Sequence, residues 1–437
     1  MDNSKNCSVE NIFNLDGRVP LLSAIPFGVQ HILAMFVANI TPIFIVAGAA
    51  GLSKEIVAIL LQNAMFIAGI ATIIQLYALG PIGSRLPIVM GVSFTFVPAA
   101  CYLSVTYGYG SMVGAVIVGG FFEGVLGLLA KYWRRLVPPL VSSLVVLTIG
   151  YSLLGVGVRS FGGGYAKDFG SFDNLFIGTI TLTVCLLYSH FATGYRKQLA
   201  VLVGLFVGYI VAFFFGKVQL DLFRNGIIAF PNLLPFTPEF NINAIISVAV
   251  IYIVSAAETI GDTSAVAMTG LDREVTEKEI RGSIACDGFF SSLSGVFGCT
   301  PITSFSQNVG LVAMTKVVNR FSIMTGAVIM ILAGLFPPIA VFISSLPDAV
   351  LGGCTIMMFG SILVSGIKMI VDNVKDSRGA TIAAIALAFG IGSTLPSEAA
   401  IWKVFPKIVQ DIFSGNCVAV VFVVAVFLNL VLPYDRR

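Results

Sequence analysis

Apolar residues fill long, nearly uninterrupted blocks along this chain, and short polar segments separate them. A helix that crosses a membrane needs about 20 such residues, and most of the blocks reach or approach that length. The pattern predicts fourteen candidate spans, at about residues 20–48, 55–80, 87–104, 111–130, 138–158, 174–193, 199–216, 243–264, 282–297, 303–315, 321–344, 347–367, 379–395 and 416–434. The third and tenth are short and bracketed by Pro or Gly, and the ninth is short and begins among polar residues.

Composition agrees with a chain that lies mostly in lipid. Of its 437 residues, 57% are hydrophobic and only 11% are charged, whereas soluble domains carry about 25% charged residues. The polar segment 1–19 holds no apolar signal-peptide core, so the first block stays in the protein. The seven cysteines are scattered without metal or disulfide spacing, and no basic block suggests nucleic acid. No Walker loop, nucleophile elbow or zinc spacing is present, so we expect neither an enzyme nor a cofactor.

Basic residues predict the orientation of the spans. If the N-terminus is placed inside and the spans alternate, 18 of the 25 Lys and Arg residues fall in inside segments. Cytoplasmic loops carry an excess of Lys and Arg. We therefore expect a multi-pass protein of the cell (inner) membrane with an even number of spans and both termini in the cytoplasm.

Two short segments echo one another. Residues 93–97 (Ser-Phe-Thr-Phe-Val) lie in the third span, and residues 304–308 (Ser-Phe-Ser-Gln-Asn) lie in the tenth, seven spans later. Because seven is odd, equivalent spans would run in opposite directions. Interrupted segments at matching positions of two halves indicate a transporter site built on inverted repeats, although chance also produces a shared Ser-Phe pair.

Two carboxylates share a helix face near the end of the eighth span. Glu258 and Asp262 are four residues apart, so their side chains project the same way. Carboxylates within a membrane are costly and are usually functional, which favours a functional Glu258. Asp262 has two interpretations, because it could also lie at a wet cytoplasmic helix end.

Other polar residues interrupt the apolar blocks. Asp287, early in the ninth span, is a candidate proton carrier or a helix cap. His31, which follows Gln30 in the first span, could relay protons, but a neutral hydrogen-bonding brace is the favoured interpretation. Glu123 in the fourth span is expected to pair with a neighbouring helix, and we give it little functional weight.

The remaining polar set suits a flat heterocycle. Glu258 and Gln307 can together present hydrogen-bond donors and acceptors to a planar, amide-rich ring, and Phe94 can stack on that ring. Helix N-termini near Ser93 and Ser304 add backbone N–H groups. This inventory favours a nucleobase over a sugar or an apolar drug.

These residues resemble the signature of the nucleobase–ascorbate transporters. The segment Gln307–Lys316 (Gln-Asn-Val-Gly-Leu-Val-Ala-Met-Thr-Lys) resembles the family motif of the tenth span, and Gln30-His31 and Glu258–Asp262 are similar to the family's first and eighth spans. The resemblance covers nearly the whole chain. It implies fourteen spans in two inverted repeats of seven, with short β segments at broken spans 3 and 10.

The resemblance also implies two domains. Residues 1–135 (spans 1–4) and 241–345 (spans 8–11) would form a core domain, and residues 136–240 (spans 5–7) and 346–437 (spans 12–14) a gate domain. Homodimers and an elevator-type motion are implied as well.

Roles follow from the resemblance one residue at a time. Glu258 and Gln307 would hold the base, Asn308 would tune affinity, and Ser93 would influence which purine fits. His31 would support the site. The proton-coupling residues would be Asp287, Asp262 and Glu258.

Branch features favour purines over related substrates. The Gly-Asp after Glu258 is similar to the xanthine and urate branch, and Gln307 argues against ascorbate. We therefore expect a proton-coupled importer of xanthine and/or urate. The alternatives are a uracil or other pyrimidine symporter of the same family, an anion exchanger of the same general fold, and a membrane-embedded enzyme or channel.

Overall fold

The fold is given by a computed structural model, which describes residues 7–218, 226, 228–374, 376–395 and 397–433. Some residues used in the sequence analysis lie outside these ranges, namely the basic residues Lys5, Arg224, Lys375, Arg436 and Arg437 and the last residue of the fourteenth predicted span, Tyr434.

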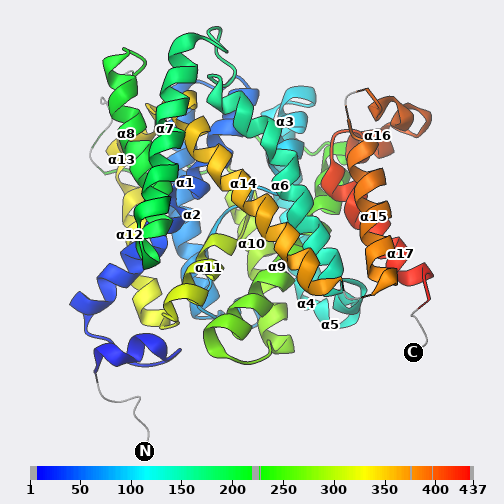
Figure 1. The fold of residues 1–437 in the computed structure, drawn as a ribbon, viewed down its shortest axis with the longest axis horizontal. Helices are drawn as coiled ribbons and strands as arrows, with labels where there is room; N and C mark the ends of the chain where they lie inside the picture. Colours follow the sequence, from blue (N-terminus) through cyan, green and yellow to red (C-terminus); the bar gives the residue numbers. More distant parts are fainter. Residues whose placement is uncertain (1–6, 219–225, 227, 375, 396, 434–437) are drawn as a thin grey trace, which may run out of the picture.

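The described chain is mostly helical (Figure 1). Its elements follow one another as η2 (Val9–Phe13), α1 (Leu21–Ala49), α2 (Lys54–Leu76), β1 (Met90–Val92), α3 (Val97–Thr106), α4 (Tyr109–Leu128), α5 (Ala130–Trp133), η3 (Arg134–Leu136), α6 (Pro139–Phe161), α7 (Phe172–Phe191), η4 (Gly194–Leu199), α8 (Ala200–Phe214), α9 (Ile242–Leu271), α10 (Glu277–Val296), β2 (Ile302–Ser304), α11 (Ser306–Thr315), α12 (Arg320–Leu335), α13 (Pro337–Ser344), α14 (Asp348–Asn373), α15 (Ser377–Gly392), η5 (Ala399–Val404), α16 (Lys407–Phe413) and α17 (Cys417–Val431). Each predicted apolar block corresponds to one helix, to a strand followed by a helix, or to a bent pair of helices.

Membrane-crossing helices are numerous. Among the described residues, seven helices are long and apolar enough to cross a membrane, and nine segments are if each of two bent pairs counts as one. The eleventh block, predicted as one span over 321–344, is instead broken, with an 81° bend between α12 and α13. Pro337 and Pro338 explain the break, because proline lacks the N–H that a continuing helix needs. The short α16 was not predicted, and it meets α17 at 98°.

The helices pack as an inverted repeat requires. α4 packs on α10 while α2 packs on α12, and α1 packs on α12 while α9 packs on α4. Each contact thus has its counterpart seven spans away. The prediction of an all-α membrane protein with two inverted halves is confirmed by this packing.

The two strands lie at the centre of the inverted repeat. β1 and β2 pair antiparallel, with Met90 opposite Ser304 and Val92 opposite Ile302. The pairing continues at both ends, since the Ser93 N–H donates to the Pro301 carbonyl at 2.8 Å and the Phe305 N–H donates to the Val89 carbonyl at 3.0 Å. Backbone groups inside a membrane must find partners within the protein. The strands satisfy each other, and the predicted β segments at the broken third and tenth spans are confirmed.

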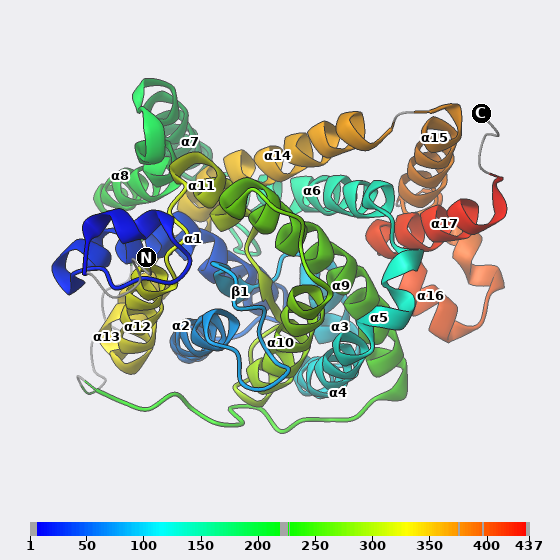
Figure 2. The same cartoon turned by 90° about the horizontal axis from the view of Figure 1, so that it is seen from below.

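The helices fall into two groups that lie side by side in Figure 2 and that we call the inner and the outer group. The inner group comprises α1–α4 and α9–α13. The outer group comprises α6, α7, α8 and α14 along one side and α15, α16 and α17 at one end. Large apolar side chains stay exposed on α7 and α8, including Phe172, Phe191, Phe206 and Phe214. Exposed aromatic side chains of this size are typical of a lipid-facing surface.

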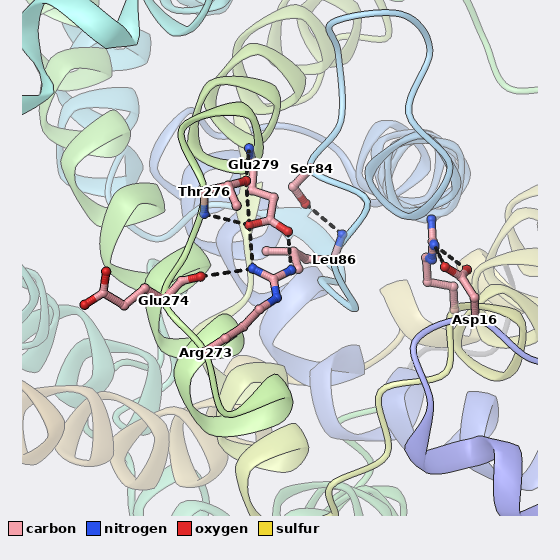
Figure 3. Close-up of polar contacts among 8 residues, drawn as sticks. Asp16, Ser84, Leu86, Arg273, Glu274, Thr276 and Glu279 are labelled. Carbon is pink, nitrogen blue, oxygen red and sulfur yellow. Dashed lines mark hydrogen bonds and ion pairs between the residues drawn. The ribbon is translucent and has the colours of Figure 1, made fainter.

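The polar connections of the inner group gather at one side of the molecule, the lower side in Figure 1. α10 begins there with a capping box, in which the Thr276 side chain accepts from the Glu279 N–H and the Glu279 carboxylate accepts from the Thr276 N–H. The Arg273 guanidinium, just after α9, donates to the same carboxylate at 2.5 and 3.0 Å (Figure 3). These contacts define the turn between α9 and α10.

Candidate functional site

A cavity of about 340 Å³ lies between the inner and outer groups of helices. From the inner group it is lined by Leu33, Ala34, Val37, Ala38, Val92, Ser93, Phe94, Glu258, Thr303, Ser304, Phe305, Ser306, Gln307 and Gly310. From the outer group it is lined by Val146, Ile149, Lys197, Val201, Met357, Met358, Ser361, Ile362 and Ser365. Its size and its mostly apolar wall with a few polar groups are typical of small-molecule sites.

Glu258 reaches this cavity from the middle of α9. Thr95, in the turn between β1 and α3, donates a 2.6 Å hydrogen bond to Glu258 Oε2. No described residue donates to the other carboxylate oxygen, Oε1. The carboxylate is therefore oriented by the broken third span and keeps one oxygen for a ligand in the cavity.

Gln307 enters the cavity from the first turn of α11. Among the described residues its carboxamide has no hydrogen-bond partner. The chain turns from β2 into α11 at Phe305, whose extended backbone (φ −99°, ψ 108°) ends the strand. The amide therefore presents both a donor and an acceptor to the cavity.

Ser93 and Phe94 also line the cavity, from the turn that follows β1. The Phe94 ring meets Phe359 of α14 edge to face, with ring centroids 5.3 Å apart. This contact joins the inner and outer groups at the cavity wall. The four predicted residues Glu258, Gln307, Ser93 and Phe94 are thus brought together around one space.

Asp262 lies behind the cavity, buried between α9 and the start of α11. Its carboxylate accepts hydrogen bonds from Ser304 Oγ at 3.2 Å and from Ser306 Oγ at 2.8 and 2.9 Å. Because α9 continues to Leu271, the alternative of a wet helix end for Asp262 is wrong. Asp262 instead ties α9 to the segment that carries Gln307.

Asp287 is fully buried within α10. Its Oδ2 accepts from the Thr259 hydroxyl, from Thr303 Oγ1 at 2.9 Å and from the Ser304 N–H at 3.4 Å. α10 begins at Glu277, so the alternative of a helix cap for Asp287 is also wrong. The carboxylate is connected to the Glu258 helix through Thr259, the next residue.

His31 and Asn308 contact each other and do not line the cavity. Asn308 Nδ2 donates to the His31 carbonyl at 3.0 Å and lies 3.1 Å from His31 Nδ1. Both side chains are buried, at 1% exposure each. They join α1 to α11 directly behind Gln307, which is the geometry of a brace.

Glu123 differs from the expectation that it pairs with a neighbouring helix. Its side chain is fully buried in α4, yet neither carboxyl oxygen has a hydrogen-bond partner among the described residues. The Ser255 hydroxyl of α9 faces Glu123, but it forms no hydrogen bond of good geometry with the carboxyl group.

The sequence analysis assigned no role to several residues that the structure places in or behind the cavity wall. The hydroxyls of Thr95, Thr259 and Thr303 hold the carboxylates, and Met357 and Met358 of α14 form part of the opposite wall. Thr95 stands within the echoed segment 93–97, so its position was available as a signal. The α14 residues had no such signal, because they belong to an ordinary apolar block.

No group of three or more His, Cys, Asp or Glu side chains within the described ranges is arranged to hold a metal ion.

Comparisons with known proteins agree with this geometry. Residues 22–398 match a family model described as "Permease family". The chain is 32% identical to the xanthine permease XanQ of Escherichia coli K12, over 100% of this chain and 97% of that protein. It is 33% identical to the xanthine permease of Bacillus subtilis 168, over 92% of each chain. Its fold resembles the transmembrane domain of the cyanobacterial bicarbonate transporter BicA, with a TM-score of 0.62, 17% identity, and coverage of 90% of this chain and 97% of that one.

Proposed function

Because the chain belongs to the nucleobase–ascorbate transporter family and is therefore a transporter rather than an enzyme, we propose that it imports purine nucleobases, xanthine and/or urate, together with protons. The observation that carries this proposal is the pair formed by Glu258 and Gln307. Both side chains line one cavity, and both keep hydrogen-bonding capacity that no described residue uses.

The pair is complementary to an oxopurine. The six-membered ring of xanthine and urate places N–H groups beside C=O groups, and a carboxamide matches that arrangement with one donor and one acceptor. The free Glu258 oxygen accepts a further ring N–H, a charge-assisted hydrogen bond that is stronger than a neutral one. Phe94 supplies an aromatic face at the cavity wall, and Ser93 lies beside it where it can influence which purine fits.

Asp287 and Asp262 support the proposed coupling to protons. Both are buried carboxyl groups one layer behind the substrate cavity, and both bond to the β2–α11 segment that carries Gln307. A change in charge at either group alters the hydrogen bonds that position this segment. Protonation of Asp287 or Asp262 and binding of the purine are thereby linked, because both act on the β2–α11 segment.

The cavity position favours an elevator-type motion. Its inner wall belongs to the proposed core domain (residues 1–135 and 241–345) and its outer wall to the proposed gate domain (136–240 and 346–437). Movement of the core against the gate would carry the base across the bilayer. We further propose, on the family resemblance and the distribution of basic residues, a homodimer in the cell (inner) membrane with both termini in the cytoplasm.

Ligand screening of the purified protein tests the substrate class. Ligands that bind the native state raise its melting temperature by mass action. We expect xanthine or urate to stabilise the protein and uracil to do so least. If uracil alone raises the melting temperature, the site would be assigned to pyrimidines instead of purines.

Uptake into vesicles tests the coupling. When the internal and external pH are held at different values, the proton gradient should drive accumulation of the purine that binds. A sodium gradient at equal internal and external pH should not. Accumulation that follows sodium at constant pH would refute the proton coupling, while leaving the purine assignment intact.

A further inference from the structure

Glu123 is a buried carboxyl group that the proposed mechanism does not yet use. It lies on α4 with no measurable solvent exposure, and neither oxygen has a hydrogen-bond partner among the described residues. An ionised carboxylate without donors in a low-dielectric interior is very costly. Glu123 therefore needs either a proton or a partner that shares one.

The backbone brings Glu123 next to Asp287. Each of the two acids immediately precedes a glycine, and Gly288 lies against the backbone of Gly124 where α4 packs on α10. A Cβ placed on Gly288 would stand 2.6 Å from the carbonyl carbon of Glu123. Only glycine permits so close an approach of the two backbones, and this approach places Glu123 and Asp287 at the contact between α4 and α10.

The polar surroundings of Glu123 are few. Asp287 of α10 and Glu258 of α9 are the charged groups that face it, and the Ser255 hydroxyl and the Tyr252 phenol also face it from α9. The Tyr252 hydroxyl already donates to the Val116 carbonyl at 3.1 Å. Within the described residues, neither α3 nor α5 turns a charged group toward Glu123.

The free oxygens of the two acids complement each other. Asp287 Oδ2 receives three donors, but its Oδ1 is buried without a partner. Three donors stabilise negative charge on Asp287, whereas the only hydroxyl among the described residues that faces the Glu123 carboxyl as a donor is that of Ser255, and it forms no hydrogen bond of good geometry. A single proton between the two groups would give Glu123 a donor function and give Asp287 Oδ1 its missing partner.

We propose that Glu123 and Asp287 form a carboxyl pair that binds the coupling proton, with Glu123 as a second proton-binding residue of the transport cycle. This inference rests on the proposed proton coupling. When Glu123 passes its proton to Asp287 Oδ1 and takes up the coupling proton in its place, both carboxyl groups become neutral. The Thr303 and Ser304 donors then lose their anionic acceptor, which carries the change to the segment bearing Gln307.

The variant Glu123→Gln separates a proton-binding role from a structural one, because the amide keeps the shape and neutrality of a protonated Glu but cannot exchange a proton. We expect purine binding and equilibrium exchange close to the wild type. With a gradient of one pH unit, each coupled proton that is lost should lower the accumulation of purine about tenfold. The pH profile of uptake should flatten.

Glu239→Gln is the matched control. Glu239 accepts from Ser111 Oγ at 2.9 Å near the other end of α4, outside the buried pair, and its variant should keep the wild-type proton-to-purine ratio. A Glu123→Gln protein with the wild-type pH profile and ratio would overturn the inference. If the wild type itself shows no dependence on protons, the proposed coupling fails, irrespective of Glu123.

If the Glu123→Gln protein does not fold, a second measurement tests the inference with other proteins. Infrared difference spectra of the wild type after a pH jump should contain a signal from a protonated carboxyl group, and Glu123→Asp should shift that signal. A spectrum that Glu123→Asp leaves unchanged, while that protein is folded and binds purine, would equally overturn the inference.

Discussion

Thr95 Oγ1 donates a 2.6 Å hydrogen bond to Glu258 Oε2, although 163 positions separate the two residues in the chain. The bond links the turn after β1, in the first inverted repeat, to α9 in the second. The carboxylate that is proposed to hold the base is therefore positioned by the repeat that does not contain it.

Glu258→Gln should abolish uptake while the protein still reaches the membrane and elutes as a single species. The amide replaces a charged acceptor, and hydrogen bonds to charged groups contribute about 1.5–3 kcal/mol. Thr95→Ala keeps the carboxylate but loses its donor, so a smaller loss of affinity is expected. Initial uptake rates of labelled purine measure both, and near-normal transport by Glu258→Gln would remove Glu258 from the mechanism.

Gln307→Ala should weaken purine binding and leave the fold intact. A polar group of the bound base would remain unpaired in a buried site, at a cost of about 1–3 kcal/mol, which raises the Kd about five- to 150-fold. Gln410→Ala is a suitable control, since within the described ranges the Gln410 side chain bonds only to the Phe405 and Lys403 carbonyls near α16. An unchanged Kd for Gln307→Ala in a titration with xanthine would contradict the site assignment.

Asn308→Ala should affect stability more than recognition. It removes both contacts to His31 in a fully buried position, and lost buried hydrogen bonds cost about 1–3 kcal/mol. We expect a lower melting temperature and a Kd that rises less than in Gln307→Ala. Lost binding with an unchanged melting temperature would instead assign Asn308 a direct contact with the base.

Asp411→Asn should loosen a contact between α3 and α16, which lie at the upper side of the molecule in Figure 1. Tyr102 donates to Asp411 Oδ1 at 2.9 Å, and Tyr107 donates to the other oxygen. Loss of this charged acceptor should let α3 separate from α16. A cysteine introduced at Ala99, which lines the small hollow between α3 and α16, should then react faster with a membrane-impermeant maleimide.

Lys407→Gln is the control for that experiment. Lys407 also contacts Asp411, at 2.9 Å, but the Lys407 side chain is 62% exposed whereas that of Asp411 is buried, so Lys407 can be replaced while Asp411 keeps both tyrosine donors. The labelling rate should change little. Equal rates in Asp411→Asn and the unsubstituted protein would show that the tyrosine contacts do not hold the two helices together.

The sequence alone determined the class of protein and most of the chemistry of its site. Lipid excludes charges and unpaired backbone groups, so long apolar blocks had to be helices, and the few polar residues within them had to face protein or a cavity. The same exclusion identified the interrupted segments near Ser93 and Gln307. Proline and glycine at their ends marked where the helices would break.

Tertiary structure alone decided which polar side chain faces which. Asn308 follows Gln307 directly, yet it turns toward His31 while Gln307 turns toward the cavity. One residue of helix rotates the side chain by about 100°, and the start of α11 is set by the pairing of the preceding strand β2 with β1. Glu123 and Asp287 come together only because glycines on α4 and α10 allow the two backbones to touch. Periodicity within single helices carries no information on contacts between distant helices, so these relationships had to come from the packing.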